Sequence, residues 1–307
     1  MAKRFVSCAV IICMLGALAS CGVQEPPGDE LSVVTTIFAP YDFARAVAGD
    51  LVQVTMLLPP AGESHSFEPT PQDIVRIRNC GVFVYVGGES DAWVERILSA
   101  MDTSKIQVVT LMDCVEVVDE ELKEGMEGED DTEPDEHVWT SPKNAGLITR
   151  KIADAMCAAD PENAAAYQAN TAKYLAELET LDGEFRKLVE GAVRKTIAFG
   201  DRFPFRYFTD AYGLDYCAAF PGCSTETEAS VNTVLFLIGK IRAEGIPVVF
   251  HAELSNENMA RAIGRATGAR VLQLHACHNI SRADYEAGKT YLDLMAENLE
   301  ALRQALA

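Results

Sequence analysis

From residue 31 onward, short apolar runs rich in β-branched residues alternate with stretches of helical periodicity. Alternation of this kind is typical of parallel sheets whose strands are joined by crossover helices. The expected strands lie at 31–37, 52–58, 82–86, 106–110, 195–199, 214–219, 247–250 and 270–274. The expected helices lie at 41–48, 71–79, 91–100, 204–212, 229–244, 255–267 and 289–305. The sequence therefore predicts an α/β fold with a parallel-type central sheet in each half.

A longer helical stretch separates the two halves. After Asp160-Pro161, residues recur at steps of three and four and define a single face, which comprises Tyr167, Thr171, Tyr174, Leu178, Leu181, Phe185 and Leu188. A helix of about 28 residues extends about 42 Å at 1.5 Å per residue. Neither half needs such a length internally, so we expect one long rigid helix that joins two lobes. A ligand site is then expected in the inter-lobe cleft, at the carboxyl ends of the strands.

The N-terminal segment has the pattern of a targeting sequence. Two basic residues precede a nearly continuous apolar run at 5–19, which is too short to span a bilayer. Small residues then precede Cys21, and the stretch 18–22 resembles a bacterial lipobox, in which the cysteine is acylated and the chain is cleaved before it. We expect a lipoprotein signal peptide at 1–20 and a flexible tether at 21–30. An ordinary secretory signal is the alternative.

Beyond the tether, the predicted segments are an N-terminal α/β lobe at 31–158, the linking helix at 159–190 and a C-terminal α/β lobe at 191–307.

The chain carries 46 acidic and 26 basic residues among 307, a formal net charge of −20. This charge disfavours nucleic acid and anionic lipid as partners, because like charges repel. We therefore expect an extracytoplasmic protein that touches the cell membrane only through lipid at Cys21.

The block 116–136 is strongly acidic, with twelve acidic residues and one lysine. A block of like charges is expected to repel itself and to stay solvated, so we interpret it as a mobile surface loop. Weak long-range attraction for cations is a functional alternative.

Of nine cysteines, six lie after Cys21. Outside the cytoplasm they are able to pair, and the separation of Cys217 and Cys223 allows a small disulfide loop. Free thiols are the alternative. The sequence contains no CxxC pair, so neither a zinc finger nor a thioredoxin motif is supported.

The five histidines all fall at or near expected strand–loop junctions, where one cleft would be lined: His65, His137, His251, His275 and His278. Neutral imidazole is a good ligand for zinc, and carboxylates suit zinc and manganese. One or two histidines from each lobe and a carboxylate would complete a four-coordinate site, provided that the fold brings them together.

Several motifs occur in an order that resembles the zinc/manganese solute-binding lipoproteins of ABC importers. They include PYDF at 40–43, HSFEPTP at 65–71, HVWTSPKNA at 137–145 and TYLDLM at 290–295. The resemblance covers nearly all of residues 31–307. It implies a metal site between two lobes, to which four side chains contribute.

The resemblance assigns the first two ligands to His65 and His137. At the third position this chain departs from the family, whose histidine or glutamate is replaced by Asp201 or Arg202, depending on a shift of one residue. Because a guanidinium stays protonated and cannot bind a cation, we choose Asp201. Arg202 could instead pair with Glu226 or Glu228.

The fourth ligand in the family is usually an aspartate just after the last strand. Here that zone holds His275 and His278, of which we favour His278. His251 stands where the family often has a supporting glutamate, so it is a supporting group or an alternative ligand.

The resemblance implies high-affinity capture of a divalent metal and delivery to an ABC permease and its ATPase, by a monomeric carrier that is not an enzyme. Three imidazoles and one carboxylate favour Zn²⁺ over Mn²⁺ as the transported ion. A manganese-binding member of the same family is the first alternative. A secreted metallohydrolase and a surface adhesin are the others, although the sequence has neither HExxH nor GxSxG.

Overall fold

The computed structural model describes residues 31–63, 67–126, 133–224 and 229–307. Residues 31–307 form one compact unit, separate from the N-terminal segment 1–30. The predicted signal peptide and tether, with Cys21, lie outside the described residues, as do His65 and Glu226. In the described part of the chain, no helix is long and apolar enough to cross a membrane.

The first half builds a four-stranded parallel sheet in the order β2-β1-β3-β4. Its strands are β1 (Ser32–Thr35), β2 (Gln53–Met56), β3 (Val82–Tyr85) and β4 (Gln107–Thr110). The helices of this half are α2 (Phe38–Ala48), α3 (Pro71–Asn79), α4 (Ala92–Ser99) and α5 (Pro142–Ala159). Helix α3 begins where Pro71 occupies the first turn and Thr70 forms a capping box with Asp73.

The second half builds a matching parallel sheet in the order β10-β9-β5-β7. Its strands are β5 (Thr196–Phe199), β7 (Asp215–Cys217), β9 (Val248–Ala252) and β10 (Arg270–Leu274), beside a short pair of β6 (Arg202–Phe203) and β8 (Phe220–Pro221). Its helices are α7 (Arg206–Tyr212), α8 (Val231–Glu244), α9 (Asn258–Thr267), α10 (Arg282–Glu286) and α11 (Tyr291–Leu306). The predicted α/β class with a parallel sheet in each half is confirmed.

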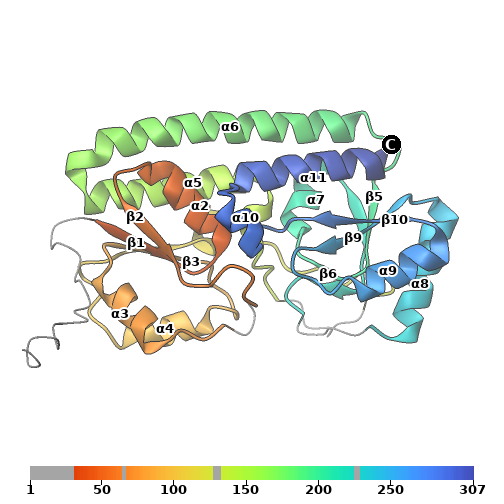
Figure 1. Ribbon diagram of the computed structural model, residues 1–307, viewed down its shortest axis with the longest axis horizontal. Helices are drawn as coiled ribbons and strands as arrows, with labels where there is room; N and C mark the ends of the chain where they lie inside the picture. The colour runs from red at the N-terminus through yellow and green to blue at the C-terminus, as the bar shows by residue number, and fades with distance from the viewer. Residues whose placement is uncertain (1–30, 64–66, 127–132, 225–228) are drawn as a thin grey trace, which may run out of the picture. The chain divides into compact units, whose positions relative to one another are not determined.

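The long helix α6 (Ala164–Glu190) packs through one face against helices of both halves, α5 and α2 toward its beginning and α11 and α7 toward its end (Figure 1). Six residues of its predicted apolar face are buried, from Tyr167 to Phe185, and the face ends on Val189 rather than on Leu188. The helix begins later than expected, because Asp160 first caps a 3₁₀ turn at Pro161–Asn163. The finer division at 31–158, 159–190 and 191–307 stays a prediction.

The prediction of an unpacked acidic block is wrong for the parts of it that the structure describes. Asp135 and Glu136 are 1% and 4% exposed. Asp119 forms a β-bridge with Pro134, and the Val118 N–H donates to the hydroxyl of Tyr207 at 3.2 Å. Partner groups from the second half therefore overcome the expected repulsion at both ends of the block.

Candidate metal centre

A cavity of about 630 Å³ opens among residues of both halves. His137 comes from the first half, while Asp201 and His278 come from loops of the second, and Arg202 begins strand β6. These loops follow strands β5 and β10, so the cavity lies where parallel strands end and where open α/β sheets commonly bind ligands. Three of the four predicted ligands thus line one cavity, and His65 is outside the described residues.

His137 lies just before the 3₁₀ turn η2 (Val138–Thr140) and is 1% exposed. Its Nδ1 lies 3.1 Å from Asp135 Oδ1, and the same oxygen accepts from the His137 backbone N–H at 2.8 Å. A histidine whose Nδ1–H is held by a carboxylate presents Nε2 as a metal donor, and we assign this tautomer to His137.

Burial lowers the pKa of His137, but the nearby carboxylates of Asp135, Glu136 and Glu120 raise it by more, and the net shift is upward. Proton binding at His137 therefore competes with metal binding at a higher pH than it would for an ordinary histidine. The negative charges that raise this pKa also favour a bound cation.

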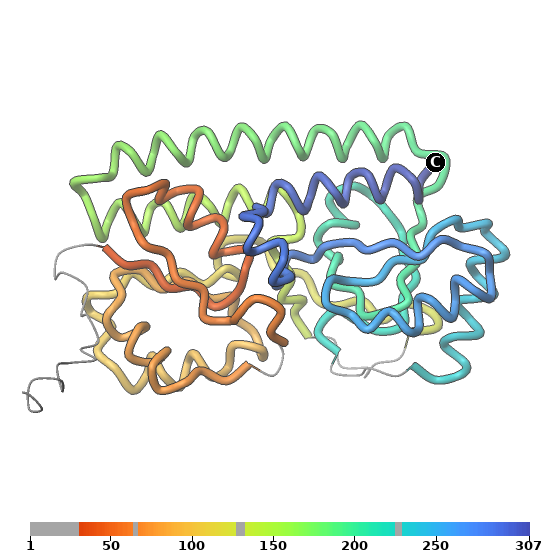
Figure 2. The backbone as a smooth tube through the Cα atoms, viewed as in Figure 1, coloured from red at the N-terminus to blue at the C-terminus, as the bar shows by residue number. Residues whose placement is uncertain are grey.

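The ring of His278 meets that of His137 edge to face, with centroids 5.4 Å apart and planes at 83°. It also lies 5.1 Å from the indole of Trp139. His278 belongs to the segment between β10 and α10, which leaves the second sheet and passes beside α2 before α11 begins (Figure 2). The carbonyl of His278 accepts from the N–H of Phe38, the first residue of α2, at 3.1 Å.

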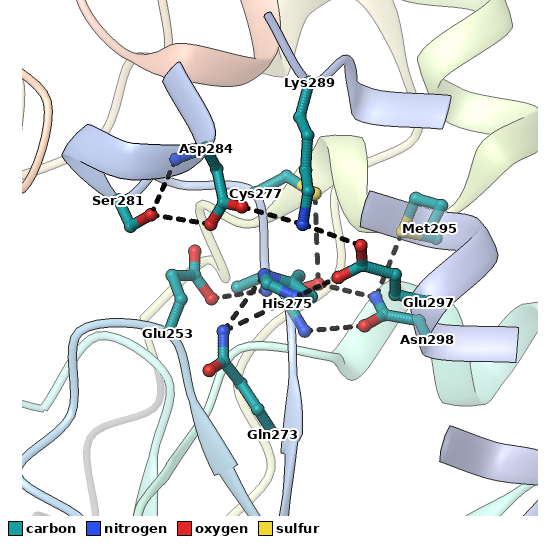
Figure 3. A network of polar contacts seen from close by, with 11 residues as sticks. Glu253, Gln273, His275, Cys277, Ser281, Asp284, Lys289, Met295, Glu297 and Asn298 are labelled. Carbon is teal, nitrogen blue, oxygen red and sulfur yellow. Dashed lines mark hydrogen bonds and ion pairs between the residues drawn. The ribbon is translucent and has the colours of Figure 1, made fainter. Parts of the chain in front are cut away.

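The loop that carries His278 is held by side chains on both of its sides. The carboxylate of Glu253, just after β9, accepts from the N–H of Ala276 at 2.6 Å and from that of His278 at 3.0 Å. From α11, Asn298 binds the N–H and the carbonyl of His275, each at 2.7 Å. Figure 3 shows Glu253 and Asn298 on either side of this loop.

The conformation and electrostatics of the loop depend on these bonds. Cys277, between Ala276 and His278, adopts a left-handed backbone with φ of 57°, which is uncommon for residues other than glycine. Desolvation raises the pKa of Glu253, and the N–H groups of Ala276 and His278 oppose that shift. The backbone of the loop is therefore fixed around His278.

Asp201 lies between β5 and β6, and Arg202 is the first residue of β6. Asp201 Oδ1 accepts from the Arg202 N–H at 2.9 Å, and the Arg202 guanidinium donates to the carbonyl of Ser224 at 3.2 Å. Among the described residues, no group of three His, Cys, Asp or Glu side chains is close enough to hold a metal ion. Asp201 therefore lines the cavity with the two histidines but does not form a closed three-donor group with them.

The other two histidines lie away from the lining of the cavity. His251 places Nδ1 2.9 Å from the carbonyl of Ala252, and its Nε2 lies 4.0 Å from Glu257. His275 places Nε2 3.2 Å from Glu297 Oε2, on the side of α11. Each imidazole therefore has a polar partner outside the lining of the cavity.

Cys217 and Cys223 are free thiols in the structure, so the small disulfide loop is not formed. Cys217 lies on β7 within the core of the second half, whereas the Cys223 sulfur lies 4.0 Å from His137 Nδ1. The two side chains therefore occupy different environments. Burial, with the charges of Asp135 and Glu120, raises the pKa of Cys223 and keeps its thiol neutral.

Sequence reasoning did not identify Asp135, Glu253 or Asn279 as residues of the site. Asp135 was hidden in the acidic block, although its place two residues before His137 was a usable signal. Glu253 follows a predicted strand as His251 does, but only the fold shows that its carboxylate reaches residues 276 and 278.

Comparison with known proteins places this geometry in a family. The family model described as zinc-uptake complex component A, periplasmic, matches residues 33–305. The chain belongs to this family. The predicted resemblance is thereby confirmed, and the family is named for a component of an uptake complex, in agreement with the predicted transport role.

Relatives in sequence and structure agree. The high-affinity zinc uptake system protein ZnuA of Bacillus subtilis is 28% identical, over 98% of this chain and 95% of that protein. The zinc-binding lipoprotein AdcA of Streptococcus pneumoniae is 27% identical over 94% of this chain, which spans only 58% of AdcA. The Zn(II)-bound ZnuA-like domain of AdcA superimposes with a TM-score of 0.76 at 26% identity, covering 90% of this chain and 99% of that domain.

Proposed function

We propose that this protein captures Zn²⁺ outside the cytoplasmic membrane and delivers it to the permease of an ABC importer, whose cytoplasmic ATPase drives uptake. The observation that carries the proposal is the pair of His137 and His278, whose rings lie 5.4 Å apart at the cavity in a member of a zinc-uptake family. Zinc is the cargo favoured over manganese, because imidazole donors suit zinc better than the oxygen-rich sites of manganese do.

The proposed ligands are His65, His137, Asp201 and His278. Among the described residues these donors do not form a closed group, and we expect zinc binding to bring Asp201 closer to the two histidines. A site closed by four protein ligands leaves no position for a reactive water, which suits carriage rather than catalysis. Arg202 supports the site only as a neighbour of Asp201, and His251 and His275 are proposed as structural groups.

Zinc binding to purified protein tests this assignment. Elemental analysis should give one zinc per chain, and competition titration should show that His137→Ala and His278→Ala each weaken binding more than about 100-fold, beyond what loss of a supporting group costs. His251→Ala is the matched control, because it removes an imidazole outside the cavity lining, and it should bind zinc as the parent does. Parent-like affinity in both cavity variants would refute the site.

We also propose that the protein is a monomer anchored by lipid at Cys21. The support is the lipobox-like sequence before Cys21 and the similarity to AdcA, which is a zinc-binding lipoprotein. One or more acyl chains on a flexible tether would keep the carrier close to its permease. Cys21→Ala should move the protein from the membrane fraction to the soluble fraction and abolish labelling by a radioactive fatty acid. Membrane association that persists without labelling would contradict the anchor.

A further inference from the structure

The side chain of Asn279 joins the loop of His278 to a turn in the first half of the chain. It is 3% exposed, and its amide nitrogen donates to the carbonyl of Pro59 at 3.0 Å and to that of Gly62 at 2.7 Å. Its amide oxygen accepts from the N–H of Ile280 at 2.8 Å. Both hydrogens of the amide are therefore donated to the turn 59–62. A backbone hydrogen bond from Ala61 to Ile280 also joins this turn to the loop.

The turn 59–62 has a conformation that needs outside support. Ala61 adopts a left-handed backbone with φ of 66°, which a residue with a Cβ adopts reluctantly. Its N–H donates to the carbonyl of Ile280 at 2.9 Å, and the N–H of Gly62 donates to the carbonyl of Pro59 at 2.8 Å. The 279–280 segment therefore supplies three of the bonds that hold the turn in place. In the sequence, His65 follows the last residue of this turn by three positions.

The same loop is also bonded to the segment that bears His137. The indole N–H of Trp139, two residues after His137, donates to the carbonyl of Ala276 at 2.7 Å. Glu253 and Asn298 hold it from the side of the second half (Figure 3). The segment 275–280 thus contacts the neighbourhoods of ligands that are far apart in the sequence.

We propose that Asn279 is a positioning residue for zinc binding, which acts by holding the turn that leads to His65 in register with the loop that presents His278. This inference rests on the proposed zinc function. It assigns Asn279 no contact with the metal. Its two amide N–H donors bond the turn 59–62 of the first half to the loop of the second half that presents His278. A residue of the same size without donors would leave the carbonyls of Pro59 and Gly62 without these bonds.

A double-mutant cycle on zinc affinity tests the proposal, with the complete protein and Zn²⁺ alone as the probe. Asn279→Ala should weaken zinc binding by about 10- to 100-fold, the usual cost of losing a group that orients a metal ligand. If Asn279 acts through His65, the same substitution in a His65→Ala background should change affinity less than about twofold, because coupled residues are not additive.

Asn298→Ala is the matched control, since it also removes two side-chain bonds to the backbone of the loop, but on the side of His278. Its effect should persist in the His65→Ala background. Thermal unfolding of the metal-free variants checks that each one folds. If Asn279→Ala does not fold, Asn279→Ser replaces it, because serine retains one donor. This variant should show an intermediate loss of zinc affinity.

The outcomes separate the two proposals. Equal losses from Asn279→Ala in both backgrounds would overturn the positioning role and leave the zinc site intact. Parent-like zinc affinity in His65→Ala would instead refute the ligand assignment, and with it any action of Asn279 through His65.

Discussion

The two histidines that meet at the cavity are held in opposite ways. His137 is fixed through its ring, by a carboxylate from its own segment 3.1 Å from Nδ1. His278 is fixed through its backbone, by Glu253 from a neighbouring strand end and by the bond from its carbonyl to Phe38. The orientation of the first ligand therefore depends on an ionisable partner beside the imidazole, whereas that of the second depends on the shape of a loop.

If His278 depends on loop shape, removing Glu253 should have the largest effect among the supporting groups. Glu253→Ala leaves the N–H groups of Ala276 and His278 unpaired, and we expect zinc affinity to fall by about 10- to 100-fold. Glu253→Gln keeps one acceptor oxygen and should fall between this variant and the parent in a competition titration. Parent-like affinity in Glu253→Ala would show that the loop keeps its shape unaided.

If His137 depends on an ionisable partner, Asp135→Asn should change the pH dependence of zinc binding more than the affinity at neutral pH. The parent should release zinc as the pH falls through the raised pKa of His137. Asparagine keeps an acceptor for Nδ1–H but removes the largest contribution that raises the pKa of His137, so this pKa should be lower than in the parent and zinc should be retained to a lower pH. We expect a loss of roughly tenfold or less at pH 7.5. Glu253→Gln is the comparison in which the pH profile near His137 should stay as in the parent.

The same pair has a second consequence in the metal-free protein. A folded-state pKa raised above the unfolded value means that the pair of His137 and Asp135 stabilises the fold at acidic pH, and that this contribution is lost as pH rises through the folded pKa. Asp135→Asn should therefore lower the unfolding temperature more at pH 5 than at pH 8. An equal decrease at both values would argue against a charged pair.

The smallest effect is expected from Arg202. It lines the cavity but is not hydrogen-bonded to Asp135 or Glu253, the side chains that support the two histidines. Its fixed positive charge opposes a bound dication, so Arg202→Gln should raise zinc affinity by about two- to fivefold at low salt, and the gain should shrink as salt screens the charge. Arg261→Gln, on the exposed side of α9, makes the same change of net charge outside the cavity and should have no such effect. A loss of affinity in Arg202→Gln would show that its bond to Ser224 matters more than its charge.

The strands and most helices could be predicted because each depends on local pattern. Helix α3 has its proline and capping box in the sequence itself, and α6 has its spaced apolar face. Helix α5 was not predicted, although Pro142 marks its first turn, and the short strand pair of β6 and β8 gave no local signal.

The site was predictable only in part, for a physical reason. The cavity brings together His137 and His278, as their expected places near strand–loop junctions suggested, with Asp201, which the family resemblance suggested. His275 does not line the cavity because its ring is held by Glu297, a partner that only the fold reveals. The burial of Asp135 likewise depends on Tyr207, which comes from the other half. Asn279 is likewise meaningful only once residues more than two hundred positions earlier lie against it.

The continuous buried face of α6 also bears on how this protein melts. Helices of both halves share that face, and the largest hydrophobic cluster includes Val33 and Ile152 from the first half together with Phe199 and Leu302 from the second. Neither half can lose its structure without exposing apolar surface that belongs equally to the other. We therefore expect heating to unfold both halves together in a single cooperative transition.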